Sequence, residues 1–136
     1  MKALVLHEAG NVSVESVPDV APHEGEALLQ VHRIGLCGSD LNSYRGKNPM
    51  VSYPRILGHE VAATIVESNN PHYTVGTNVT LSPYTQCGKC PSCLGGRPNA
   101  CQFNETMGVQ RDGALSEYIA VPTGNCLLYT SPSPRD

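Results

Sequence analysis

The sequence lacks a long apolar run. No stretch approaches the about 18 residues that a membrane-spanning helix needs, and Glu8 and Gly10 come too early for the apolar core of a signal peptide. Positive charge is also scarce, because nine Lys and Arg are spread along the chain against twelve Asp and Glu. No basic stripe is therefore available to neutralise phosphates. We expect a soluble, cytoplasmic protein that binds neither membranes nor nucleic acid.

The sequence also lacks internal repeats, helical heptads and any Gly-x-Gly-x-x-Gly segment after a strand. That segment would indicate a dinucleotide site at the start of a helix. At 136 residues the chain suits one domain and is short for a core plus a separate cofactor domain. The sequence therefore predicts a single domain, without a dinucleotide-binding domain.

What the sequence does contain is typical of a compact β-rich domain. Hydrophobic residues make up 40% and charged residues 15%, with 13 Gly and 11 Pro for turns. Alternation of apolar and polar residues predicts strands over residues 2–6, 11–17, 26–34, 60–67, 78–82 and 115–121. Short helical turns are predicted after Ser39 and Asp40, and over residues 92–95. The expected fold is mainly β, a partly open antiparallel barrel with few short helices.

Six cysteines in a chain without an export signal indicate metal ligands or reactive thiols rather than disulfides. Four of them follow a Cys-x2-Cys-x2-Cys-x7-Cys spacing in a loop rich in Gly, Pro and Asn: Cys87, Cys90, Cys93 and Cys101. Such a loop cannot stabilise itself by burial, whereas four thiolates around a tetrahedral zinc would order it and leave no open coordination position. The spacing predicts a structural zinc site. The alternatives are a disulfide pair, free thiols, or a redox switch with exposed, metal-free thiolates.

A second set of candidate ligands lies at predicted strand ends. Cys37 follows one strand, and His59 and Glu60 open another, so a thiol and an imidazole can converge. Taken singly, such a Cys is more often a small buried residue and such a His an ordinary surface or core group. Taken together, they suit a catalytic zinc, which has three protein ligands and one open position.

Four motifs occur in the order found in zinc-containing medium-chain dehydrogenases, which the chain resembles over residues 1 to about 125. They are Cys37-Gly38-Ser39-Asp40, Gly58-His59-Glu60, the four-cysteine segment and Asp112-Gly113-Ala114-Leu115-Ser116-Glu117-Tyr118. The resemblance implies a GroES-like catalytic domain with a zinc-binding loop lobe.

The resemblance also implies roles for single residues. Cys37 and His59 would be ligands of a catalytic zinc, with Glu60 as an alternate or water-mediated ligand. Ser39 would pass the proton of the substrate alcohol towards solvent, and Asp40 would hold the ligand histidine. Ser39 and Asp40 can equally serve as a helix cap, and both readings can hold at once.

The reaction that the resemblance implies is alcohol oxidation. Zinc would lower the pKa of the bound hydroxyl while hydride leaves for NAD or NADP on a neighbouring domain. The sequence of residues 52–57, before Gly58, most resembles that of sorbitol, idonate and galactonate dehydrogenases. This resemblance implies that the small-molecule substrate is a secondary alcohol of a polyol or sugar acid. Tyr44, Arg45 and Arg55 are candidate contacts to such a substrate, although loop residues of these types are usually just solvated. A homo-oligomer is implied for the full-length enzyme.

Two positions depart from the family pattern. Ala63 stands where a glycine is usual, and Gly76-Thr77-Asn78-Val79 replaces the common Gly-Asp-Arg-Val. Neither departure touches a proposed ligand. A glycine at position 63 would allow close backbone approach, so Ala63 raises a question of local packing rather than of metal binding.

The end of the chain, residues 126–136, fits neither the family's next strand nor its following helix. These residues can be encoded by a DNA sequence that resembles a transposase adapter used in sequencing libraries, read in frame, and we hypothesise that they are not native. A disordered tail is the alternative. On this interpretation residues 1–125 are an incomplete catalytic domain that is inactive alone, and Cys126 is no ligand. A stand-alone zinc-stabilised β domain that binds a partner, with Cys37 and His59 as core residues, is the competing hypothesis.

Overall fold

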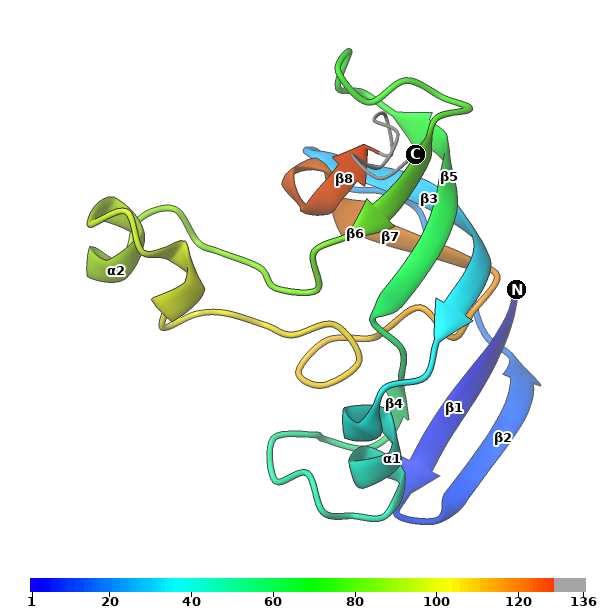
Figure 1. Ribbon diagram of the computed structural model, residues 1–136. Coiled ribbons are helices and arrows are strands. Elements are labelled where there is room, and N and C mark those ends of the chain that lie inside the picture. Colours follow the sequence, from blue (N-terminus) through cyan, green and yellow to red (C-terminus); the bar gives the residue numbers. More distant parts are fainter. Residues whose placement is uncertain (129–136) are drawn as a thin grey trace, which may run out of the picture.

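The computed structural model of the protein describes residues 1–128 as two antiparallel sheets with few short helices (Figure 1). The smaller sheet has the order β2-β1-β4 and the larger the order β7-β3-β5-β6-β8. The strands are β1 (Lys2–Glu8), β2 (Asn11–Ser16), β3 (Glu26–Gly35), β4 (Arg55–Ile56), β5 (Glu60–Ser68), β6 (Asn78–Leu81), β7 (Tyr118–Pro122) and β8 (Cys126–Leu128). The predicted mainly β fold is confirmed.

Most predicted strands coincide with observed ones, and the differences have local causes. The last predicted strand begins at Tyr118 rather than at residue 115, because Ser116 forms an isolated bridge to Ala3 and Leu115 accepts the Leu4 N–H at 2.8 Å. Strands β4 and β8 were not predicted, since two or three residues are too few to show an alternating pattern.

The core lies on one face of the larger sheet. Successive side chains of a strand point to opposite faces, so Val61, Ala63 and Ile65 of β5 are buried while Glu60 and Ala62 are exposed. Ala63 is 2% exposed and pairs with Val31 of β3 and Val79 of β6. The side chain that departs from the family pattern therefore packs into the core, and the register between β3 and β5 shifts directly beside its pair with Val31.

Helix is confined to short segments: α1 (Gly38–Tyr44), α2 (Pro91–Leu94) and the 3-10 helices η1 (Pro98–Ala100) and η2 (Thr123–Asn125). Cys37, not Ser39, occupies the N-cap of α1, and the Asp40 carboxylate accepts the Cys37 N–H at 3.0 Å. None of the helices in residues 1–128 has the length and apolar composition to cross a membrane.

Residues 85–105, which we call the cysteine lobe, extend away from the two sheets as an arm that carries α2 and η1 (Figure 1). The base of the lobe is closed by an isolated bridge between Tyr84 and Thr106, and the Met107 N–H donates to Pro83 at 2.9 Å. Large apolar side chains on the lobe are open to solvent: Leu94 is 76% and Phe103 60% exposed. Burial of apolar surface therefore contributes little to the order of the lobe.

The first residues of the terminal segment form part of the larger sheet. Leu81 pairs with Cys126 and Val79 with Leu128, and Cys126 is 4% exposed within the core cluster. Residues 126–128 therefore form a strand, although their sequence does not fit the family's next strand. The other residues of the terminal segment, 129–136, lie outside the described part of the chain. The origin of the segment stays a prediction.

The buried Cys126 thiol is expected to be unreactive in the folded protein. Burial raises the pKa of this thiol to about 11, so at pH 8 only about one thiol in a thousand is the reactive thiolate. Alkylation with iodoacetamide at pH 8, followed by peptide mass spectrometry, should label Cys126 only after urea is added. Complete labelling without denaturant would show that the position is open to solvent.

Candidate metal centres

The four predicted zinc ligands of the cysteine lobe come together. The sulfur atoms of Cys87, Cys90, Cys93 and Cys101 all lie within 4.8 Å of one another. Cys90 is the N-cap of α2 and Cys93 lies within that helix, while Cys101 directly follows η1. The short helices thus turn the chain so that the four sulfur atoms face one another. All four are free thiols, which does not favour the disulfide alternative.

Backbone N–H groups point at the sulfur atoms of this cluster. The Cys90 N–H lies 3.3 Å from the sulfur of Cys87, and the N–H groups of Cys87 and Phe103 both lie 3.4 Å from the sulfur of Cys101. N–H donors stabilise a thiolate more than a thiol, because the ionised sulfur is the better acceptor. The loop backbone is therefore arranged for negatively charged sulfur.

The pKa values of two of these thiols agree with that arrangement. A hydrogen bond from the Lys89 backbone lowers the pKa of Cys87, and one from the Cys93 backbone lowers the pKa of Cys90 to about 6. Removal from water raises the pKa of Cys93 to about 11, and a hydrogen bond with the Cys90 side chain acts in the same direction. A divalent cation would offset that rise by displacing the proton. Soft thiolate donors in this number fit zinc.

The second set of candidate ligands also converges. The ligand atoms of Cys37, His59 and Glu60 lie within 4.8 Å of one another. Cys37 stands between β3 and α1, His59 precedes β5, and Glu60 is the first residue of β5. The antiparallel pairing of β3 with β5 brings these strand ends together, as the sequence suggests. The donor set of one thiol, one imidazole and one carboxylate fits a zinc with an open position.

Asp40 connects the segment that carries Cys37 with the segment that carries His59. The side chain is buried, its Oδ2 accepts the Cys37 N–H at 3.0 Å, and its Oδ1 accepts the Gly58 N–H at 3.2 Å. The same Oδ1 lies 3.5 Å from Nδ1 of His59, an ion-pair distance rather than a hydrogen bond. Because the carboxylate faces Nδ1, Nε2 is the imidazole nitrogen left for a ligand.

Ser39 lies in the first turn of α1, two residues after Cys37, and is half-buried. Its carbonyl accepts the Ser43 hydroxyl at 3.1 Å. Ser39 is thus close in sequence to the candidate ligand Cys37. The role of its hydroxyl in proton transfer stays a prediction.

Residues 112–115 hold the loop that carries His59, a role that the sequence did not reveal. Gly113 donates to Ile56 at 2.7 Å, Ala114 to Gly58 at 2.9 Å and Leu115 to Leu57 at 2.9 Å. A Cβ atom at Gly113 would overlap the backbone of Leu57 and Gly58, so only glycine lets the two segments approach this closely.

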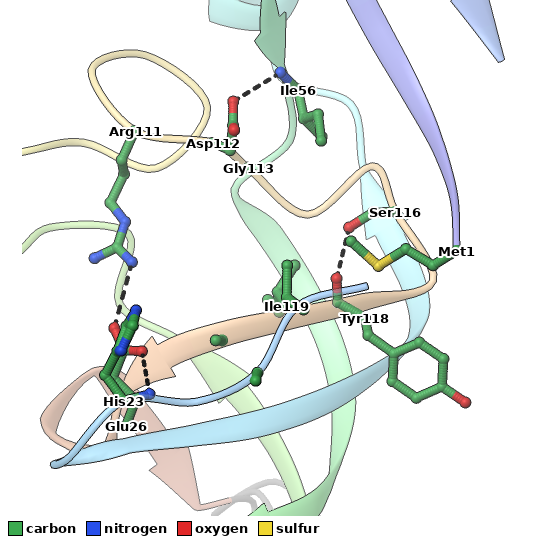
Figure 2. A pocket seen from close by; sticks show the side chains of 13 residues that line it. Met1, His23, Glu26, Ile56, Arg111, Asp112, Gly113, Ser116, Tyr118 and Ile119 are labelled. Carbon is green, nitrogen blue, oxygen red and sulfur yellow. Dashed lines mark hydrogen bonds and ion pairs between the residues drawn. The ribbon is translucent and has the colours of Figure 1, made fainter. Parts of the chain in front are cut away.

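Asp112 fixes the same loop through its side chain (Figure 2). Its Oδ1 accepts the Ile56 N–H at 3.1 Å and lies 3.1 Å from the Arg55 guanidinium. Arg55 also donates to the Ser52 hydroxyl at 2.7 Å. Arg55 therefore makes its polar contacts within the protein, which weakens its candidacy as a substrate contact.

Two cavities flank this region, and they differ in chemistry. The cavity of Figure 2, about 510 Å³, has Tyr118 on one side and Arg111 and Glu26, 4.0 Å apart, on the other, and no candidate metal ligand is among its lining residues. The other, about 430 Å³, is lined by both His59 and Glu60. The second cavity therefore adjoins two of the three candidate ligands of the open cluster.

Replacing Gly113 by alanine is expected to destabilise the domain by about 2–3 kcal/mol, at the upper end of the usual cost of overpacking. The reason is that the new Cβ would meet backbone, which cannot move aside as a flexible side chain would. Urea denaturation followed by circular dichroism measures the change. Gly124→Ala is the control, because open space surrounds a Cβ at that position. Equal stabilities of the two variants would contradict the close approach.

The fold is that of the GroES-like domain of zinc-type dehydrogenases, with a cysteine lobe and an open cluster at the strand ends. Residues 23–131 match the model of the alcohol dehydrogenase GroES-like domain, and the chain belongs to that family.

Relatives and solved structures agree with this membership. A zinc-type alcohol dehydrogenase-like protein of Haemophilus influenzae is 42% identical, over 90% of this chain and 36% of its own length. L-galactonate-5-dehydrogenase of Escherichia coli is 41% identical, over 78% of this chain and 32% of its own length. The crystal structure of Escherichia coli RspB with NADH superimposes with a TM-score of 0.86 at 35% identity, over 94% of this chain and 38% of RspB. The chain spans about a third of the length of the curated relatives it matches.

Proposed function

We propose that the chain is the catalytic-domain part of a zinc-dependent oxidoreductase that uses NAD or NADP to oxidise a secondary alcohol of a polyol or sugar acid to a ketone. The observation that carries this proposal is the convergence of Cys37, His59 and Glu60 within 4.8 Å, with the Asp40 carboxylate behind them. Similarity to L-galactonate-5-dehydrogenase supports the substrate class.

Two metal ions belong to this proposal. Cys87, Cys90, Cys93 and Cys101 would hold a structural zinc, and Cys37, His59 and Glu60 would hold a zinc that keeps a position open. When bound at the open cluster, zinc supplies Lewis-acid stabilisation of an alkoxide. The third lasting protein ligand would come from residues outside this sequence.

The residues of the chain orient the reacting groups. The Asp40 carboxylate, 3.5 Å from Nδ1 of His59, would orient the imidazole ring so that Nε2 faces the metal. The Ser39 hydroxyl would accept the alcohol proton and pass it towards solvent, since Ser39 is half-buried at the start of α1. The cavity beside His59 and Glu60 would receive the substrate.

The nicotinamide would be bound by a domain outside this sequence, so we expect the chain alone to be inactive. RspB, which is crystallised with NADH, supports this division, because the chain matches only 38% of it. We further propose that residues 1–125 are the native domain segment and that residues 126–136 derive from an adapter.

Recovery of the source gene tests these statements together. The proposal expects the open reading frame to diverge from this sequence near residue 126 and to encode a strand followed by Gly-x-Gly-x-x-Gly within about 60 residues. The full-length product should then reduce NAD or NADP with polyols or sugar acids. A genomic stop codon after Asp136 would instead favour a stand-alone binding module.

A further inference from the structure

Gly35 stands directly opposite the carboxylate of the open cluster. It is the last residue of β3, and its partner in the antiparallel register is Glu60, the first residue of β5. A Cβ atom at Gly35 would overlap the Glu60 carboxylate, and it would lie 3.0 Å from the Cβ and 3.2 Å from the Cδ of Glu60. The side chain of Glu60 is therefore folded across the Cα of Gly35.

Backbone conformation does not explain the glycine at this position. Gly35 is absent from the glycines with positive φ, and it continues a regular strand pairing. Any residue can adopt such a backbone. What the position requires is the space that a side chain would fill, and that space holds the carboxylate of Glu60.

Glu60 has no other group to fix its carboxylate. The residue is exposed, and none of the ion pairs found within residues 1–128 involves it. An exposed glutamate side chain otherwise samples several rotamers. The space above Gly35 thus permits the rotamer that places the carboxylate near Cys37 and His59.

We propose that Gly35 is a positioning residue of the open metal cluster. Its missing side chain lets the Glu60 carboxylate lie across β3, within reach of the metal that Cys37 and His59 would hold. The inference rests on the proposed metal site, and it adds a residue that cannot itself be a ligand. Any side chain at position 35 would push the carboxylate away from the other two ligand atoms.

Cobalt binding tests the proposal in the full chain. Co²⁺ is titrated into protein whose cysteine lobe is already loaded with zinc, and visible absorption reports the second ion. Gly35→Ala should weaken that second binding about 10–100-fold, the usual effect of losing a group that orients a ligand. Gly38→Ala is the matched control, because open space surrounds a Cβ there, and it should bind as the wild type does.

A double-mutant cycle separates positioning from general destabilisation. In a Glu60→Gly background both the carboxylate and the Cβ that a side chain at position 35 would meet are gone, so Gly35→Ala should have no further effect on cobalt affinity. If Gly35→Ala alone fails to fold, the Glu60→Gly/Gly35→Ala variant should fold. Equal loss in both backgrounds, or no recovery of folding, overturns the proposal.

The outcome for Gly35 is distinguishable from that for the metal site. Unchanged cobalt binding in His59→Ala would refute the open cluster itself, and with it the proposed function. Loss of binding in His59→Ala with wild-type affinity in Gly35→Ala would leave the cluster in place and refute only the role of Gly35.

Discussion

Cys90→Ser is expected to release one zinc ion per chain and to unfold the cysteine lobe while the two sheets stay folded. Cys90 is 4% exposed, and its N–H lies 3.3 Å from the sulfur of Cys87. With Leu94 and Phe103 open to solvent, the lobe has little apolar burial to replace the metal. Structural zinc sites contribute about 10–16 kcal/mol of binding free energy to small domains. Loss of one ligand should therefore destabilise the lobe more than any other single substitution in this segment.

Zinc content and amide hydrogen exchange measure this effect. The expected result is one zinc fewer than in the wild type, with protection lost in residues 85–105 and kept in β3 and β5. Cys37→Ser is the control, because it removes a thiol outside the lobe and should leave the lobe protected. Unchanged zinc content with full protection of the lobe in Cys90→Ser would contradict the structural zinc site.

His59→Ala in the full-length protein is expected to lower kcat/KM by about a thousandfold or more without unfolding the domain. Lewis-acid stabilisation by a catalytic metal contributes several kcal/mol, and each 1.36 kcal/mol corresponds to about tenfold in rate. The loss should be large because His59 is one of the three side chains in residues 1–128 that converge at the cluster. The fold should persist, since His59 is not part of the hydrophobic core cluster.

The measurement is steady-state NADH formation with a polyol substrate, together with circular dichroism to verify folding. His72→Ala is the matched control, because it removes an exposed imidazole in the turn between β5 and β6. Turnover comparable to that of the wild type in His59→Ala would defeat the assignment of His59.

The sequence predicted the elements that rest on local patterns. Alternating burial revealed β5, where Val61, Ala63 and Ile65 face the core, and the spacing of the four cysteines indicated their convergence. The roles of Gly35 and Gly113 were not predicted, because each depends on a contact with a segment distant along the chain. No local pattern shows which backbone a glycine will meet.

The terminal strand β8 illustrates a different limit. Residues 126–128 join β6 through backbone pairing, which depends little on the identity of the side chains. A short foreign segment can therefore occupy an open strand edge as readily as a native one. Pairing at this position does not distinguish an adapter-derived segment from a native strand.

Because the two ends of the cysteine lobe lie side by side, the lobe is an insertion whose length can vary independently of the sheets. The chain enters it after Tyr84 and leaves it before Thr106, and these two residues form a bridge. An insertion or deletion between them leaves the spacing of β6 and of residues 107–118 unchanged. Evolution can thus lengthen, shorten or replace this arm without disturbing the strand ends at which Cys37 and His59 converge.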